Sequence, residues 1–211
     1  MEAGVAYGVC VGSDEKLERY VLPRTMLSVV YTRRHQTSIA KAYNGMLDDA
    51  RADGFQVLIL QHDDLEITDP DGEEKIVAAL QGAHIGLVGV AGGGDGNGLS
   101  WWTHEPIGHQ KTDTMDIDFG RCSGVATLLE GSLLAFGPWA IAHLRFDERY
   151  PGFHGYDCDI ARQCREKLMF NAVVDVDTWH HNPMGFKSEA SHQEWLACDV
   201  IFREKWGVTG K

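Results

Sequence analysis

The side chains best able to do chemistry lie in three short clusters. The first, His62-Asp63-Asp64, follows the apolar run Phe55 to Leu60 after the single residue Gln61. Neighbouring carboxylates repel one another, so holding them together is favourable mainly when a divalent cation or a donor-rich ligand lies between them. The cluster is therefore a candidate site for a divalent cation or a donor-rich ligand, and a solvated acidic turn is the alternative.

The second cluster is Phe146-Asp147-Glu148 followed by residues 152–159, which include His154 and Asp157 beside aromatic residues. It lies where a helix is predicted to begin. A carboxylate at a helix N-terminus is stabilised by unpaired N–H groups and by the helix dipole. Simple helix capping would explain Asp157, but it does not explain why His154, Asp157 and Asp159 lie together with aromatic residues; chance clustering is the alternative.

The third cluster is Trp179-His180-His181-Asn182. Neutral imidazole is a ready ligand for Mn²⁺, Zn²⁺ and similar ions, and spacing alone does not decide which of the two histidines faces a site. The indole rings of Trp101, Trp102 and Trp179 could stack on the faces of sugars, or they could be ordinary packing residues.

Short β-type runs alternate with amphipathic helical runs, which predicts an α/β layer architecture. The clearest helix begins near Thr37 and Ser38, carries an apolar stripe from Ile39 to Ala50, and is closed by Gly54. Strands are expected at 6–11, 26–31, 55–60, 84–90, 125–129, 133–136 and 172–176, and further helices at 13–20, 71–80, 156–168 and 188–205. In such sheets ligands gather at the carboxyl ends of the strands, where the first and third clusters are expected.

Composition narrows the range of partners. The 211 residues include 31 acidic and 19 basic side chains, a formal charge of −12, which disfavours nucleic acid and anionic membranes as ligands. No apolar run approaches the roughly 20 residues of a membrane helix, and no signal peptide is evident, so we expect a cytoplasmic protein. The five cysteines are scattered without a CxxC pair, which favours reduced thiols over disulfides or a structural zinc site.

Common nucleotide-binding and hydrolase motifs do not occur. The glycine-rich segment 91–98 nowhere satisfies GxGxxG and is followed by Ser100-Trp101-Trp102 instead of a helix, so we interpret it as a loop. There is no Walker A motif and no GxSxG elbow.

Several motifs occur together in the order found in the family 2 glycosyltransferases. They are the acidic cluster after the 55–60 strand, the helix SIAKAYNGMLDDA from Ser38, the helix start Tyr156-Asp157-Cys158-Asp159, and the pair His180-His181. From the first strand to Lys205-Trp206 the chain resembles this family, and more narrowly its short single-domain glycosyltransferase-like members. The resemblance implies one GT-A type α/β domain over residues 1–211, with a mixed, mostly parallel sheet flanked by helices.

The resemblance also implies a donor side. The helix containing Asn44 looks like the one that lines the nucleotide-sugar pocket. His62-Asp63-Asp64 looks like the DxD motif, which binds a metal that bridges the donor diphosphate, with His62 in place of the first Asp. The expected donor-binding residues are Asn44, His62 and Asp63, and the expected ligands of Mn²⁺ or Mg²⁺ are Asp64 with His180 or His181.

An acceptor side is implied as well. Asp157 matches the general base of the family's ED motif, although Tyr156 stands where Glu is usual. Glu130, with Gly131 after it, resembles the Asp-Gly step on the acceptor side, to which we also assign Trp102 and Asp159. The QxxRW motif of processive synthases is absent at 202–206, so a non-processive enzyme is expected.

The resulting hypothesis is an inverting, metal-dependent glycosyltransferase that moves a sugar from a nucleotide-diphosphate donor to a hydroxyl of a glycan, small-molecule or protein acceptor. One alternative is a GT-A domain that binds the donor without transfer, or a nucleotidyltransferase. Another is a zinc hydrolase that uses His154, His180, His181 and Asp157, although no HExxH pattern supports it.

Overall fold

A seven-stranded sheet forms the centre of the computed structural model, which describes residues 4–25, 28–182 and 188–209. Its strand order is β2-β1-β3-β11-β5-β12-β9. The strands are β1 (Val5–Val11), β2 (Val29–Arg34), β3 (Val57–His62), β5 (Ile85–Gly89), β9 (Gly124–Ala126), β11 (Leu133–Phe136) and β12 (Phe170–Val173). Only β9 and β11 run against the other five, so the predicted mixed, mostly parallel sheet is confirmed.

A smaller sheet of order β10-β6-β7-β13-β4 adjoins the first, and β8 pairs with β7. It comprises β4 (Leu65–Ile67), β6 (Ala91–Gly93), β7 (Ile107–Thr112), β8 (Asp116–Asp118), β10 (Leu128–Leu129) and β13 (Thr178–His180). Because β4 follows β3 after a two-residue turn, this sheet carries the His180 segment to the carboxyl end of β3.

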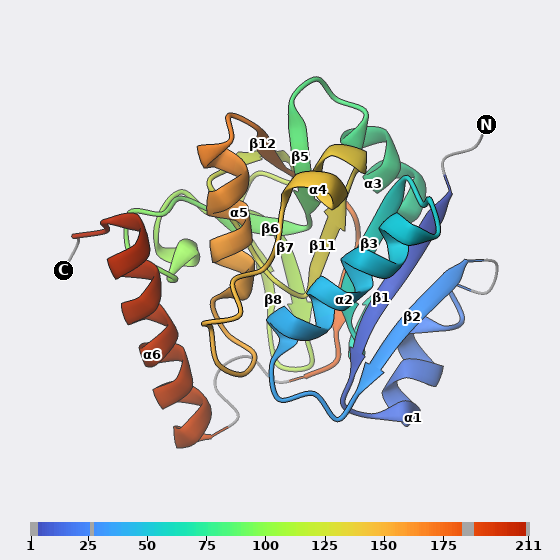
Figure 1. Ribbon diagram of the computed structural model, residues 1–211, viewed down its shortest axis with the longest axis horizontal. Coiled ribbons are helices and arrows are strands. Elements are labelled where there is room, and N and C mark those ends of the chain that lie inside the picture. Colours follow the sequence, from blue (N-terminus) through green and yellow to red (C-terminus); the bar gives the residue numbers. More distant parts are fainter. Residues whose placement is uncertain (1–3, 26–27, 183–187, 210–211) are drawn as a thin grey trace.

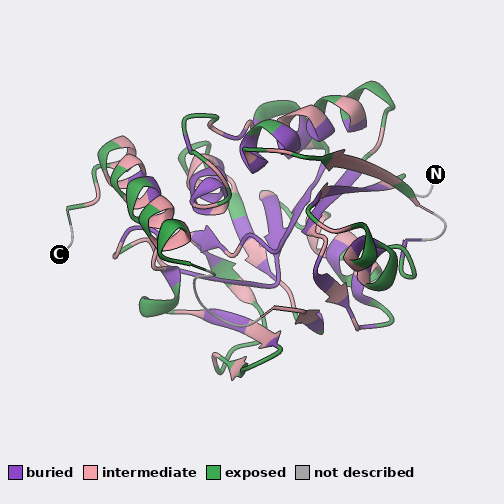
Figure 2. Cartoon of the chain, turned by 90° about the horizontal axis from the view of Figure 1, so that it is seen from below, coloured by how far each residue is buried: buried purple, intermediate pink, exposed green. Residues whose placement is uncertain are grey.

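Helices cover both faces of the large sheet (Figure 1). In β3, Leu58 and Leu60 pack with residues of α2 (Ile39–Ala52), α4 (Pro138–His143) and α5 (Tyr156–Glu166). Val57 and Ile59 point to the opposite face, which α3 (Gly72–Leu80) covers. The β3 residues 57–61 are buried, as expected for a strand sandwiched between two layers of helices (Figure 2).

Helix α2 confirms the strongest sequence prediction. Its Ser38 side chain caps the N-terminus, its apolar stripe is buried, and Gly54 follows with φ +79°. Close packing of α2 on the sheet requires Gly8 in β1, since a Cβ there would lie 2.8 Å from the sulfur of Met46.

The C-terminal helix α6 (Glu189–Trp206) packs beside α5 at one edge of the molecule (Figure 1). Its ends agree with the predicted 188–205 helix, with Ser188 as N-cap and Gly207 as C-cap. None of the helices among the described residues has the length and apolar character needed to cross a membrane. All five cysteines are free thiols.

Several element predictions need correction. The predicted strand 125–129 is divided between β9 and β10, which belong to different sheets, and the predicted strand 172–176 is β12, which ends at Val173. The expected 91–98 loop begins with β6, and the 13–20 helix is a short α1 (Asp14–Lys16) followed by the π-helical η1 (Leu17–Val21). Positions 26 and 27 of the predicted strand 26–31 lie outside the described residues, and β2 begins at Val29.

Candidate functional site

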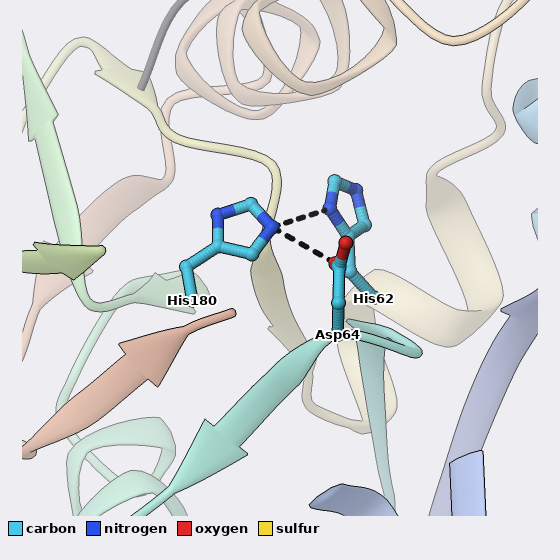
Figure 3. A group of neighbouring side chains, drawn as sticks. All are labelled: His62, Asp64 and His180. Atoms are coloured by element: carbon cyan, nitrogen blue, oxygen red, sulfur yellow. Dashed lines mark hydrogen bonds and ion pairs between the residues drawn. The ribbon is translucent and has the colours of Figure 1, made fainter. Parts of the chain in front are cut away.

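Three side chains from separate parts of the chain converge at the carboxyl end of β3. His62 ends β3, Asp64 lies in the turn before β4, and His180 ends β13. The Nε2 atom of His180 lies 3.0 Å from Asp64 Oδ1 and 3.5 Å from His62 Nδ1 (Figure 3). We call these three residues the triad; one nitrogen or oxygen from each lies within 4.8 Å of the others.

Pairing of β4 with β13 places the triad. His180 is opposite Leu65 in this antiparallel pair, and the backbone N–H of His181 donates to the Asp64 carbonyl at 2.7 Å. Asp64 is only 4% exposed. Burial opposes its ionisation, but His180, His62 and Lys16 outweigh that effect and hold the pKa of Asp64 well below its usual value. Asp64 is therefore a carboxylate at neutral pH.

The structure separates the two adjacent histidines. His180 belongs to the triad, whereas the Nε2 of His181 lies 2.8 Å from Glu66 Oε2. The ring of His181 is stacked between Tyr20, at 3.7 Å, and Trp179, at 4.7 Å. His181 therefore packs the end of β13 against η1 and is not one of the three triad residues.

Tyr156, the first residue of α5, connects the triad to the second cluster. Its hydroxyl lies 2.8 Å from His62 Nε2 and donates to the carbonyl of Gly131 at 2.9 Å. A phenol carries one proton, so the hydroxyl that donates to Gly131 accepts from the N–H of His62 Nε2. The tautomer of His62 then has its lone pair on Nδ1, the nitrogen that faces His180.

Asp157 lies next to this connection. Burial raises the pKa of Asp157 to about 7, and the nearby Glu130 carboxylate adds to the shift. Gly131 must lack a side chain, because a Cβ there would lie 2.5 Å from the Tyr156 hydroxyl and 2.9 Å from Asp157 Oδ2. A carboxylate with a pKa near neutrality is well matched to accept a proton from a hydroxyl.

Other residues assigned from the sequence have different placements. The Asn44 amide donates to the Phe146 carbonyl at 3.0 Å and accepts from its N–H at 2.8 Å, so it anchors the 146–148 segment to α2. Asp63 Oδ2 accepts from the N–H groups of Gly12 and Ser13, both at 2.7 Å. Asp63 therefore ties the loop after β1 to the turn after β3.

Asp159 is fully buried, and its carboxylate holds α6 in place. It accepts from Trp206 Nε1 at 2.9 Å and from Gln163 Nε2 at 2.8 Å, and it pairs with Lys205. These contacts occupy both oxygens, so we leave Asp159 out of the acceptor site. Trp102 is 45% exposed in η2 (Trp101–Thr103), with its ring near Trp195, and stays an acceptor-side candidate.

The residues proposed for a zinc hydrolase are not brought together. His154 lies 3.0 Å from Ser191 Oγ and 3.9 Å from Glu194, and is not among the triad residues. With His181 also directed to Glu66, only His180 of the three histidines remains in the triad. This placement gives no support to the hydrolase alternative.

One residue that the sequence reasoning missed is Lys16 in α1. Its Nζ atom pairs with Asp64 Oδ2 at 2.9 Å. Residues 16 and 64 are 48 positions apart, and they meet because β1 and β3 are parallel neighbours in which Cys10 is level with His62. The rule that loops after neighbouring parallel strands meet at one edge could have indicated the contact.

The triad fits a divalent cation. Two imidazole nitrogens and one carboxylate oxygen are typical ligands, and ligands that each bind a metal at about 2.0–2.2 Å lie roughly 3–3.5 Å apart. The observed separations of 3.0 and 3.5 Å lie in this range. Asn182 Nδ2 also lies 2.9 Å from His180 Nε2, which therefore has three polar neighbours. One proton on this nitrogen cannot make hydrogen bonds to all three. The nitrogen-rich set suits Mn²⁺ better than Mg²⁺.

Comparison with known proteins identifies the family. The model of the glycosyltransferase-like family matches residues 5–203. The chain belongs to this family. It is 31% identical over 190 residues to the streptomycin biosynthesis protein StrF of Streptomyces griseus, covering 84% of this chain and 66% of StrF, just under two thirds of that relative's length. The family predicted from the sequence is thus confirmed, and the enzyme class of this family is glycosyltransferase.

Solved structures confirm the GT-A fold. The chain is similar to GalNAc-T7 bound to UDP, GalNAc and Mn²⁺, with a TM-score of 0.66, 12% identity, and coverage of 97% of this chain and 48% of that one. It is also similar to the mannosyltransferase PcManGT of Pyrobaculum calidifontis bound to GDP-Man and Mn²⁺, with a TM-score of 0.60, 13% identity, and coverage of 99% and 65%. A third similar structure is A197 from STIV, with a TM-score of 0.57, 9% identity, and coverage of 85% and 86%.

Proposed function

We propose that this protein is an inverting, non-processive glycosyltransferase that requires a divalent cation. The observation that carries the proposal is the link between the triad and Asp157. Tyr156 contacts His62 of the triad through its hydroxyl, and Asp157 is the next residue on α5. A candidate metal site and a candidate general base therefore lie on either side of one tyrosine, at the carboxyl edge of the sheet.

The triad would hold the cation through His62 Nδ1, Asp64 and His180 Nε2. When bound, a divalent cation stabilises the negative charge that develops on a departing nucleoside diphosphate. Mn²⁺ is the expected ion and Mg²⁺ the weaker substitute, because two of the three ligands are imidazoles. The Mn²⁺ bound to GalNAc-T7 and to PcManGT supports this choice.

Asp157 would take the proton from the acceptor hydroxyl as that oxygen attacks the anomeric carbon. Direct displacement of the diphosphate from the opposite face inverts the anomeric configuration. Its pKa of about 7 allows Asp157 to be ionised in a large fraction of molecules at neutral pH while remaining basic enough to accept a proton. Glu130 and Trp102 are the acceptor-side candidates.

The partners proposed are a nucleotide-sugar donor and an acceptor with a hydroxyl group, which is a glycan, a small molecule or a protein. The overall charge of −12 disfavours nucleic acid as the acceptor. Asp63 would contribute to the donor side indirectly, since its carboxylate fixes the backbone of Gly12 and Ser13.

Ligand-induced thermal stabilisation tests the donor side. We would measure melting with UDP, GDP, dTDP and CDP, each with and without Mn²⁺, for the wild type and Asp64→Ala. A ligand at about 100 times its Kd stabilises the fold by about 2.7 kcal/mol. We expect one nucleotide to raise the melting temperature only with Mn²⁺, and Asp64→Ala to abolish the rise.

Asp157→Asn tests the transfer step. The substitution removes the proton acceptor and keeps the size of the side chain, so we expect transfer to fall by about 10² to 10⁴ with nucleotide binding retained. Unchanged transfer by this variant would exclude Asp157 as the base. Nucleotide binding by the wild type with no transfer to any acceptor would favour a binding domain.

A further inference from the structure

Lys16 is held at the triad by contacts on several sides. Asp63 fixes the backbone at Gly12 and Ser13, and the Ser13 hydroxyl then accepts from the N–H of Lys16 at 3.3 Å. Leu17 is buried in an apolar cluster beneath the helix. Four residues after Lys16, Tyr20 stacks on the ring of His181. Lys16 is therefore aimed at Asp64 by the surrounding fold.

The ion pair changes the charge of the candidate metal site. With neutral imidazoles, the triad carries one negative charge, that of Asp64. The Nζ atom of Lys16 lies 2.9 Å from Asp64 Oδ2, and a lysine paired with a carboxylate is an ammonium at neutral pH. The triad together with Lys16 then carries no net charge.

We propose that Lys16 is a diphosphate-binding residue that makes the cation and the nucleoside diphosphate bind cooperatively. The inference rests on the proposed function. Because the Lys16 ammonium is paired with Asp64, it would repel a divalent cation that binds to Asp64 without nucleotide. The diphosphate supplies the missing negative charge, and the 36%-exposed Lys16 side chain is accessible to a phosphate oxygen.

The proposal predicts opposite effects on two affinities. Lys16→Met keeps the length and the apolar stem of the side chain but removes its charge. Loss of this charge removes its repulsion of a cation that carries two positive charges. We therefore expect Mn²⁺ alone to bind Lys16→Met at least about tenfold more tightly than the wild type.

The same variant should bind the nucleoside diphosphate more weakly. With Mn²⁺ saturating, we expect the Kd of the nucleotide selected from UDP, GDP, dTDP and CDP to rise by about tenfold. Because linkage is reciprocal, the factor by which nucleotide strengthens Mn²⁺ binding should fall as well. A lysine with a purely structural role would not strengthen one affinity while weakening the other.

The measurements are Mn²⁺ titrations followed by the electron paramagnetic resonance signal of the unbound ion, and calorimetric titrations of the nucleotide. Lys16→Arg should retain the wild-type behaviour because it keeps the charge. Arg19→Met is the matched control, since it removes an exposed cation of the neighbouring turn whose guanidinium lies over Tyr20. It should leave both affinities unchanged.

The outcomes separate this inference from the proposed function. Mn²⁺ binding that is equal in the wild type and in Lys16→Met, or weaker in the variant, would overturn the role of Lys16 and leave the metal site standing. Absence of Mn²⁺ binding in both proteins, with and without nucleotide, would overturn the metal site and the inference with it. Mn²⁺ binding without nucleotide by Lys16→Met but not by the wild type would support the proposal strongly.

Discussion

The most informative single substitution is Tyr156→Phe, which removes one oxygen from the connection between the triad and Asp157. The aromatic ring stays in the core, where Tyr156 is buried against Tyr43 and Phe146. The hydrogen bonds lost are the 2.8 Å contact with His62 Nε2 and the 2.9 Å bond to the Gly131 carbonyl. The variant therefore tests whether the hydroxyl holds His62 in the tautomer that presents Nδ1 to a metal.

The loss of these two contacts should lower both the affinity for the metal and the stability of the fold. Loss of an outer-shell partner of a ligating histidine typically lowers metal affinity or activity by 10- to 100-fold, which is about 1.4 to 2.7 kcal/mol. Loss of the bond to Gly131 should lower the free energy of unfolding by about 1 kcal/mol, which is roughly 2 to 4 °C in melting temperature for a domain of this size. The first effect is specific to the metal, and the second is not.

Tyr43→Phe is the matched control. Tyr43 is also fully buried, packs edge-on against Tyr156 with ring centroids 5.7 Å apart, and directs its hydroxyl to the Gln61 carbonyl at 3.4 Å. This substitution removes the same atom close to the site without touching His62. It should lower stability by a similar or smaller amount and leave the affinity for Mn²⁺ unchanged.

The assay is a Mn²⁺ titration in the presence of the selected nucleotide, together with transfer rates at low and at saturating Mn²⁺. We expect Tyr156→Phe to bind Mn²⁺ at least tenfold more weakly and to regain much of its rate as Mn²⁺ is raised. Equal Mn²⁺ affinities for Tyr156→Phe and Tyr43→Phe would refute the reasoning, because the hydroxyl would then have no influence on the ligand nitrogen of His62.

The remaining predictions concern the two carboxylates of α5. Asp157 must be ionised to act as the base, so kcat/KM should rise with pH below about 7 and level off above it. Glu130→Gln removes a neighbouring negative charge and should shift this rise in kcat/KM to lower pH. A rate independent of pH between 5 and 8 would contradict this prediction. Asp159→Ala should lower the free energy of unfolding by about 2 to 3 kcal/mol, because the substitution leaves Trp206 and Lys205 without a buried partner, while transfer at low temperature persists. Chemical denaturation would measure the loss, and a variant as stable as the wild type would contradict the structural role of Asp159.

Sequence periodicity predicted the large sheet and its main helices because their signals are local. The stripe from Ile39 to Ala50 and the continuous apolar run in β3 determine which faces are buried, and the structure buries them. The smaller sheet was largely missed. Its strands β4, β8 and β13 are three residues long, and β4 and β13 depend on pairing between segments more than 100 positions apart, such as His180 with Leu65. Strands this short have no usable periodicity.

The same limit applies to the site. Asp64 and the pair His180-His181 were recognisable by residue type and by their place after strands, without a choice between the two histidines. Lys16 and the hydroxyl of Tyr156 are placed at the triad by contacts between distant segments. For Asn44 and Asp159, residue type alone did not indicate the hydrogen bonds that the structure shows. Both have residue types suited to ligand binding, and the fold uses them to join α2 to the 146–148 segment and α5 to α6. Residue type suggests what a side chain can do, and its hydrogen-bond partners decide which of those uses remains available.

The candidate metal site and the candidate base Asp157 come from different elements of the fold but lie close enough to influence each other. The candidate metal ligands come from β3, the turn before β4, and β13, whereas the candidate base lies on α5 next to Tyr156, whose hydroxyl contacts His62 and the Gly131 carbonyl. The positive charge of a cation bound at the triad would attract the Asp157 carboxylate and favour its ionised form. Binding of the metal would thereby increase the fraction of Asp157 able to accept a proton.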